Sequence, residues 1–465
     1  MTVSFTREDY NNHERKWAKT RNVVESNVRN YIDPVDPTDE ERNKKYINDA
    51  QFTNFTGRTK HGLVGAIFRR KLIADLPPTI QYAVEDVTGS GMGLNKLAQE
   101  ITGELLITGR YGLLVDFPAL ESPATLAELE QNNIKARIYR YRAESIINWK
   151  TDLINGQPKL TLVVLKECLS QIDPDDGFKW SNSDQYRVLR LIDGVYVQDL
   201  YNKDEEMVSR QVVLDYSGNP FDHIPFFFAG SEDNDSELDN IPLYDLALLN
   251  IGHLKNSADY EESVHIVGQP TVVFATDYSP EQFADANPGG IRVGARRGHN
   301  LGPGGSATFL QASPNQLADS AMQRKEEQAV MIGARLITAT ADRETAEAAR
   351  MRYSGETSVL STIADNVENV LEQCCKELER FSGNTTGDIK ITVNKHFFDK
   401  NIDPNLIMAQ IQLAEKKVLS KVDIRQTLRE HGIVPETRSD SDIDADINKD
   451  PVQVDQNNNF PTNGT

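Results

Sequence analysis

Three long amphipathic stretches occupy the middle of the chain and give its clearest pattern. Residues 241–267 and 314–335 are each predicted to form one helix, and a longer third helix follows and reaches to about Phe381. In that third helix apolar residues recur every three or four positions, at Leu360, Ile363, Val367, Val370, Leu371, Cys374, Leu378 and Phe381. This spacing puts them on one side of the helix, so we expect that side to pack against a core.

The first of these helices has an apolar face and a polar remainder. Near the apolar face lie Leu243, Leu246, Ala247, Leu249, Leu254 and Ala258. Elsewhere around the helix lie Asp245, Lys255, Asp259 and Glu262. Pro242 suits a first turn, and Gly268 and Pro270 are expected to end the helix. About 25 residues at a rise of ~1.5 Å each make a rod of roughly 37 Å.

The segment between the first two helices, 269–312, has strand and turn character. It opens with TVVFA at 271–275 and carries IRVGARRGHNLGPGGSATFLQ at 291–311. The three pieces together predict a helix–tip–helix hairpin. The basic groups of the tip are Arg292, Arg296, Arg297 and His299. Each can be a solvated loop charge, an ion-pair partner between subunits, or a contact to passing phosphates that reads no bases.

A short polar stretch, 336–346, joins the second helix to the third. The residues at 337–349, ITATADRETAEAA, are mostly small and polar, so we expect this segment to change conformation at a low cost in free energy. Basic residues surround this joint at Arg335, Arg343, Arg350 and Arg352. The same alternatives apply to them as to the basic groups of the tip.

A mixed α/β block precedes the hairpin. Short helices are predicted at 21–32 and 40–53, and an amphipathic helix at 94–108 leads into a buried strand at 113–117. After a further helix at 124–131, residues 135–230 carry strand patterns separated by Asn-Gly and Asp-Gly turns. We interpret 135–230 as one antiparallel meander.

The segment after the third helix is predicted to be mostly helical. A strand is expected at 388–398, then a helix at 404–417 and a short helix ending at Gly432. The remaining tail alternates acidic and small residues and ends in NNNFPTNGT, which is typical of disorder.

The bulk composition limits the class of protein. A chain of 465 residues is too long for one core, so two to four domains are expected. No apolar run approaches the ~20 residues that span a bilayer, and the N-terminus lacks the apolar core of a signal, so we expect folding in a cytoplasm. The net charge of −20 argues against tight phosphate binding over most of the surface, without excluding DNA as a partner.

No constellation typical of catalysis is present. The cysteines, Cys168, Cys374 and Cys375, form no CxxC and are interpreted as small buried apolar residues. The eight histidines lack HExxH spacing, and the glycines at 89, 91 and 93 precede a helix without a phosphate-loop pattern. Asp440, Asp442, Asp444 and Asp446 begin like a calcium loop but lack its glycine and glutamate. We therefore expect no enzyme and no cofactor or metal site.

Three passages carry a family resemblance. They are LITGRYGLLVDFP at 106–118, NIPLYDLALLNIGHLKNSADYEESVHIVGQPTVV at 240–273, and EEQAVMIGARLITATADRETAEAARMRYSGETSVLSTIADNVENVLEQC at 326–374. With the order of elements over about 20–430, they resemble the portal protein of tailed bacteriophages, the head-to-tail connector family.

The resemblance implies an α+β, mainly helical, multidomain fold. The implied regions are a wing at 1–235 and 347–402, stem helices at 236–268 and 313–335, a clip at 269–312, a tunnel loop at 336–346, a short crown at 403–435 and a disordered tail at 436–465. The implied channel residues are Thr338, Thr340, Asp342, Arg343 and Glu344, and the implied docking edge is Arg292, Arg296, Arg297 and His299.

The resemblance also implies the partners. A portal is a closed homo-oligomeric ring, generally a dodecamer, in the virion at one capsid vertex, assembled in the host bacterial cytoplasm. Double-stranded DNA passes through it during packaging and ejection. The terminase large subunit, a head-tail adaptor, the major capsid protein and the scaffold contact it, and no membrane or cofactor is involved. Two other interpretations stay open: a capsid-associated scaffold or connector that never encloses DNA, and a nucleic-acid enzyme, which needs an acidic metal cluster.

Overall fold

The computed structural model describes residues 2–36, 38–117, 135–173, 175–215, 217–269, 271–290, 298–311, 316–332, 346–383, 387–395 and parts of 408–449. The chain divides into two compact units, Met1–Asn394 and Lys395–Thr465. Within the described ranges, no helix combines the length and the apolar character needed to cross a bilayer.

The N-terminal segment forms helices α1 (Glu8–Val24), α2 (Glu40–Asp49) and α3 (Phe55–Ile67), with a short 3-10 helix η1 (Arg29–Tyr31) after α1. The helix expected at 21–32 is therefore wrong. The chain leaves the helical path after Val24 because Ser26 adopts a left-handed backbone with φ of 66°. The helix expected at 40–53 ends at Asp49, and Asn54 caps the next helix by accepting the Gly57 N–H.

Helix α4 (Leu94–Thr108) has the predicted bounds and is buried along most of its length. Asp86 occupies the glycine turn before it, since its carboxylate accepts the N–H groups of Gly89 and Gly91. Gly109, with φ of 70°, turns the chain from α4 into β2 (Arg110–Asp116). A side chain at this position would meet the Asn240 carbonyl at 2.6 Å, so the turn requires glycine.

The strands of 135–230 divide into two antiparallel sheets, which corrects the expectation of one meander. β3 (Arg137–Arg142) and β9 (Phe226–Gly230) pair with the two edges of β2. The other sheet consists of β4 (Ile146–Ile154), β5 (Gln157–Ile172), β6 (Trp180–Ile192), β7 (Val195–Tyr201) and β8 (Met207–Val212) in sequence order. Its turns at Asn155-Gly156 and Asp193-Gly194 have positive φ at both positions, as tight hairpins require. Cys168, expected to be buried, is exposed on β5.

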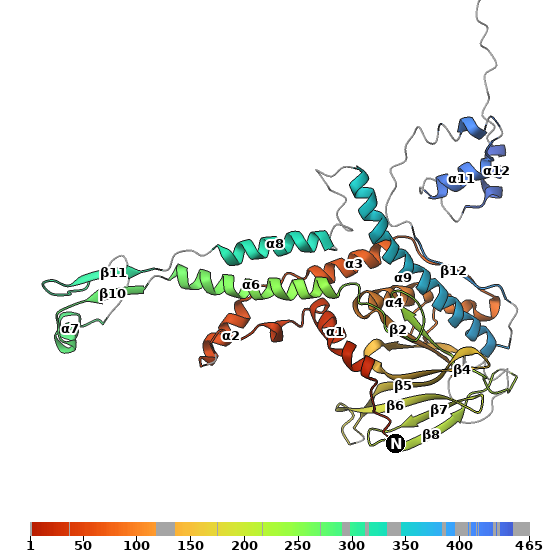
Figure 1. The fold of residues 1–465 in the computed structure, drawn as a ribbon, viewed down its shortest axis with the longest axis horizontal. Coiled ribbons are helices and arrows are strands. Elements are labelled where there is room, and N and C mark those ends of the chain that lie inside the picture. Colours follow the sequence, from red (N-terminus) through yellow and green to blue (C-terminus); the bar gives the residue numbers. More distant parts are fainter. Residues whose placement is uncertain are drawn as a thin grey trace, which may run out of the picture. The chain divides into compact units, whose positions relative to one another are not determined.

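The predicted hairpin follows, with one element that the sequence interpretation missed (Figure 1). It consists of α6 (Tyr244–Gly268), β10 (Thr271–Ala275), α7 (Pro280–Ala286), β11 (Ser306–Leu310) and α8 (Leu317–Ile332). Helix α6 begins at Tyr244, so Pro242 lies before the helix and not in its first turn. Ser279 and Gln282 form a capping box at α7, and this pattern was readable in the sequence.

Helix α9 (Ala346–Phe381) confirms the apolar stripe of the third helix. All eight stripe residues are at most 5% exposed, and Cys374 and Cys375 are both buried. The face packs on α4, β2 and β9. The strand expected at 388–398 is shorter, β12 (Lys390–Thr392), and pairs with β1 (Ile73–Asp75); a second 3-10 helix, η2 (Pro78–Val84), follows β1.

The second unit contains α11 (Lys421–Glu430) and α12 (Asp440–Lys449). The expectation that 436–465 is disordered is therefore wrong for α12. Its carboxylates are matched by arginines, because Asp440, Asp444 and Asp446 form ion pairs with Arg425, Arg429 and Arg438. The predicted helix at 404–417 lies largely outside the described residues, and so does the helix at 124–131.

Candidate functional site

The α6–α8 hairpin is the candidate site, and its root is embedded in an apolar cluster. Helices α1, α2 and α3 pack against α6. The cluster contains Val23, Val28, Ile32, Tyr46, Ala50, Ala247, Ile251, Leu254 and Ala258. Beyond Ala258 no residue of α6 is buried, although the helix continues to Gly268. The hairpin is therefore fixed at one end and leaves the core at the other.

Asn250 locks this root by polar contacts that the sequence interpretation missed. It is fully buried, and its side-chain oxygen accepts the N–H groups of Phe55 at 3.0 Å and Thr56 at 3.2 Å. Its amide nitrogen donates to the Thr53 carbonyl at 2.8 Å. Asn250 thus satisfies donors at the N-terminus of α3 from a different helix. The available signal was an asparagine within an apolar stripe.

Polar contacts from α2 support α6 past its buried half. Tyr46 donates its hydroxyl proton to Asp259 at 2.7 Å, and Arg42 forms an ion pair with Glu262 at 2.7 Å. Burial raises the pKa of the Tyr46 hydroxyl above its ordinary value, and the hydrogen bond to Asp259 raises it further. These contacts hold the outer part of the rod without an apolar core.

Helix α8 returns along α6 and packs against it, with polar contacts between the two helices. The Lys325 ammonium donates to the Asn256 side-chain oxygen at 2.6 Å, and His253 Nε2 lies 3.1 Å from Glu326 Oε1. Gly252 allows close approach, because a Cβ at that position would lie 3.1 Å from Lys325 Cε. His253 is itself buried, with its ring edge against Phe55 at 5.0 Å.

Most of α8 remains uncovered in the single chain. Ala329 is the one buried residue among those described in this helix. Its large apolar residues are instead exposed: Leu317 by 75%, Val330 by 40%, Met331 by 58% and Ile332 by 47%. These exposed apolar residues lie at the two ends of α8, one at its first residue and three at its last turn.

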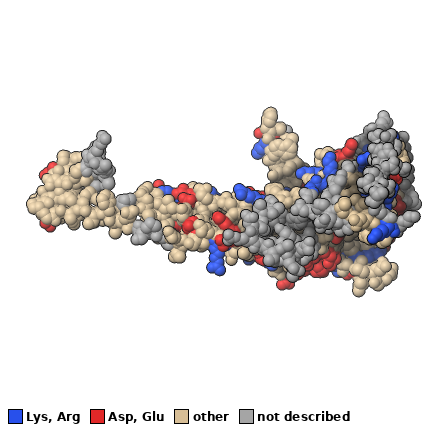
Figure 2. Space-filling model, turned by 90° about the horizontal axis from the view of Figure 1, so that it is seen from above, with Lys and Arg blue, Asp and Glu red and all other residues tan. Residues whose placement is uncertain are grey.

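The two hairpin helices are predominantly acidic. The carboxylates are Asp245, Asp259, Glu261, Glu262, Asp319, Glu326 and Glu327, against three basic side chains, Lys255, Arg324 and Lys325. Figure 2 shows both signs along the hairpin, whereas the end with β10, β11 and α7 has a mostly uncharged surface on this face. The hairpin therefore lacks the basic track that grips a phosphate backbone.

The tip is a two-stranded sheet with a loop folded against it. β10 and β11 pair from Thr271↔Leu310 to Ala275↔Ser306. Asn287 fixes the loop, since its amide donates to the Asn300 carbonyl at 2.9 Å and its oxygen accepts the Asn300 N–H at 2.9 Å. His299 is half-buried and packs edge-on against Phe274 at 5.2 Å. This aromatic contact gives His299 a packing role in the tip.

The other predicted site residues lie outside the described residues. This holds for Arg292, Arg296 and Arg297 of the docking edge. It also holds for the predicted channel residues Thr338, Thr340, Asp342, Arg343 and Glu344. Their assignment remains a prediction.

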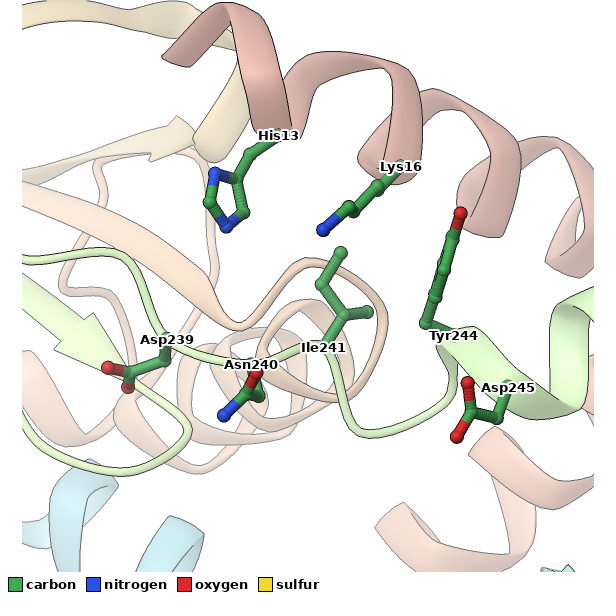
Figure 3. Close-up of a pocket in the computed structure, with 7 residues that line it drawn as sticks. All are labelled: His13, Lys16, Asp239, Asn240, Ile241, Tyr244 and Asp245. Atoms are coloured by element: carbon green, nitrogen blue, oxygen red, sulfur yellow. The ribbon is translucent and has the colours of Figure 1, made fainter. Parts of the chain in front are cut away.

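A pocket of about 280 Å³ lies beside the start of α6 (Figure 3). It is lined by His13, Lys16, Asp239, Asn240, Ile241, Tyr244 and Asp245. His13 and Lys16 project from α1 toward the segment 239–241, and Lys16 Nζ lies 5.9 Å from the Tyr244 ring centre. Burial raises the pKa of Asp239, although the N–H groups of Glu232 and Asp233 donate to it. The described residues contain no group of three His, Cys, Asp or Glu side chains placed to hold a metal.

Arg110 holds the acidic linker, residues 231–239 (SEDNDSELD), that leads into α6. Its guanidinium is sandwiched at 4.1 Å from both the Trp149 and Phe228 rings, and it donates to the Ser236 carbonyl at 3.1 Å. Burial lowers the pKa of Arg110 to about 9. A buried cation against a run of linker carbonyls and carboxylates fixes where α6 begins. No sequence pattern predicted that Arg110 stacks between these two rings.

A family model described as a domain of unknown function (DUF4055) matches residues 242–382, which are the hairpin and α9. No match was found among curated proteins.

The chain is similar to several solved structures. It resembles a chain in the neck of a native gene transfer agent particle computed with C12 symmetry, with 16% identity and a TM-score of 0.41 over 80% of this chain and 89% of that one. It is similar to a chain of the virion of the native gene transfer agent, with 15% identity and a TM-score of 0.41 over 88% and 98%. An HK97 family phage portal protein from Corynebacterium diphtheriae has 10% identity and a TM-score of 0.29 over 75% and 96%.

Proposed function

We propose that this chain is a phage-type portal protein, a structural subunit of a closed ring through which double-stranded DNA passes. The observation that carries the proposal is the α6–α8 hairpin. Its root is locked into the core by Asn250 and the apolar cluster, whereas α8 buries only Ala329 among its described residues. A long element that is rigid at its base and uncovered along its side is suited to packing against further copies.

The apolar residues of α8 favour a head-to-tail contact. Met331 and Leu317 lie on a helix that has no further cover within the described chain, so burial against a neighbouring copy removes them from water. A head-to-tail contact between identical copies closes into a ring when the rotation per subunit divides a full turn. The ring has the symmetry that a conduit at a single vertex needs.

The acidic hairpin supports a sliding role rather than a gripping role. Each phosphate contact adds salt-dependent affinity and holds DNA in place. Seven carboxylates against three basic side chains on α6 and α8 disfavour such contacts. In the proposed ring the segment 336–346 is the tunnel loop, with Thr338 and Arg343 toward the channel. The segment 269–312 is then the clip that docks the terminase and the head-tail adaptor.

An interface variant tests the assembly. Met331→Glu puts a charge at an exposed apolar position of α8, and Gln328→Glu adds the same charge at an exposed polar position of the same helix. We expect native mass spectrometry to show loss of the ring for Met331→Glu and retention of the wild-type mass for Gln328→Glu. A wild-type chain that is monomeric or forms open fibres would contradict the proposal. A ring without a channel would favour the connector that does not enclose DNA.

A further inference from the structure

The β5–β6 hairpin extends beyond the rest of its sheet. β4 pairs with β5 only as far as Leu165, and β7 pairs with β6 only from Tyr186 onward. The segments Glu167–Ile172 and Trp180–Gln185 therefore pair only with each other. At a rise of about 3.3 Å per residue this two-stranded ribbon reaches roughly 20 Å past its neighbours.

The end of the ribbon is apolar and exposed. Ile172 lies directly opposite Trp180 in the strand register, so both side chains project from the same face. Ile172 is 46% exposed, Trp180 62%, and Phe178 in the connecting turn 95%. Two hydrogen bonds hold the described residues of the turn: Asp173 N–H donates to the Lys179 carbonyl at 2.8 Å, and Phe178 N–H donates to the Asp176 carboxylate at 3.1 Å. Exposed aromatic side chains at the end of a projecting ribbon are typical of a protein-binding anchor.

The charges at the ribbon's end select the kind of partner. Lys166 pairs with Asp184 at 2.8 Å, and Lys179 pairs with Asp173 at 3.6 Å. Asp175 and Asp176 are left without an ion-pair partner among the described residues of the ribbon. Their exposed carboxylates repel phosphates and disfavour nucleic acid or an anionic membrane.

We infer that Ile172, Phe178 and Trp180 dock into an apolar pocket, rimmed by basic side chains, on the shell protein that surrounds the ring. This inference rests on the proposed function. It names a partner surface separate from the ring contacts, which run along the hairpin. The ribbon belongs to the sheet β4–β8, whereas the proposed terminase-docking strands β10 and β11 are reached only through α6 and α8 (Figure 1).

Cross-linking in assembled particles tests the partner. Phe178 is replaced by p-benzoylphenylalanine, and the matched control carries the same replacement at Leu153, which is 78% exposed at the end of β4. We expect illumination to join position 178, and not position 153, to the major capsid protein. A cross-link from 178 to a second copy of this chain or to DNA would overturn the inference, and so would a yield no higher than that of the control.

Trp180 provides a second readout in the isolated ring. The chain has three tryptophans, and Trp17 and Trp149 are 1% and 2% exposed, so acrylamide quenching reports mainly on Trp180. We expect equal quenching in the ring and in the dissociated Met331→Glu chain. Protection of Trp180 on ring formation would identify a second copy as the occupant and refute the inference.

Removal of the anchor separates this inference from the proposed function. We expect Phe178→Ser with Trp180→Ser to form wild-type rings but to enter particles roughly tenfold less often, the loss typical of removing an aromatic anchor. Leu153→Ser should enter normally. Wild-type incorporation of the double variant would contradict the docking role, whereas failure of the wild-type chain to form rings would contradict the proposed function and not the cross-link.

Discussion

Replacement of Asn250 by leucine tests whether the hairpin root is fixed as described. Leucine fills a similar volume but accepts and donates no hydrogen bond. The change removes the partner of two N–H groups, on Phe55 and Thr56, and of the Thr53 carbonyl. Thr56 is fully buried, whereas Phe55 and Thr53 are partly exposed.

The expected loss follows from these exposures. A buried polar group left without a partner costs about 1–3 kcal/mol, and water can replace the partner at the two partly exposed positions. We therefore expect Asn250→Leu to destabilise the chain by about 2–4 kcal/mol. Asn256→Leu is the matched control on the same helix. Asn256 is only partly buried and bonds to the flexible Lys325 side chain, so we expect a loss of about 1 kcal/mol or less.

Hydrogen exchange followed by mass spectrometry measures the effect at its origin. If exchange proceeds through opening of the α3 N-terminus, 2–4 kcal/mol accelerates it roughly 30- to 1000-fold in peptides that cover 53–57. Urea unfolding at one fixed protein concentration gives the total, because assembly makes stability depend on concentration. Unchanged exchange in 53–57, or equal losses for the two asparagine variants, would refute the anchoring role of Asn250.

Three further perturbations test separate parts of the account. Gly252→Ala should change stability by no more than about 1 kcal/mol, because helix propensity offsets a small shift of Lys325, whereas Gly252→Leu should separate α8 from α6 and lower the ring yield in native mass spectrometry. The pKa of His223 is raised. Burial and the nearby Arg380 lower it, but the contacts with Glu377 and Asp222, both at 3.0 Å, raise it by more. The protonated His223 stabilises the fold fully below its unfolded-state pKa of about 6.5, and this stabilisation is lost as pH rises through its raised folded-state pKa. The Tm difference between wild type and His223→Gln should therefore shrink from pH 6 to pH 9. A constant Tm difference would contradict this role of His223. Deletion of 338–344 should leave the ring mass unchanged apart from the missing residues but impair DNA packaging, and normal packaging would show that the tunnel loop is misplaced.

The sequence predicted those elements whose burial repeats locally. The stripe of α9 and the bounds of α4 follow from the helical period, because each apolar position reports the same packed face. The hairpin was likewise predictable from two amphipathic runs around a strand-bearing segment. Asn250 shows where this reasoning ends, since its partners lie almost 200 residues away in sequence and no local period records them.

The sheet division was not predictable for the same physical reason. Every strand of 135–230 has a similar local pattern. Strands β3 and β9 are separated from the other strands only because both pair with β2, which lies outside this range. Arg110 is a further case, because its burial depends on rings contributed by β4 and β9. In the second unit, α12 has a composition typical of disorder and folds against arginines of another segment.

The central claim is that copies of this chain close into a ring around an open channel. Negative-stain electron microscopy of the purified full-length chain tests it most directly, since end-on class averages display both closure and the central opening. We expect closed rings with one symmetry and a central opening wide enough for a DNA duplex, and we expect Met331→Glu to abolish these rings. Monomers, open fibres, or rings with a filled centre would contradict it.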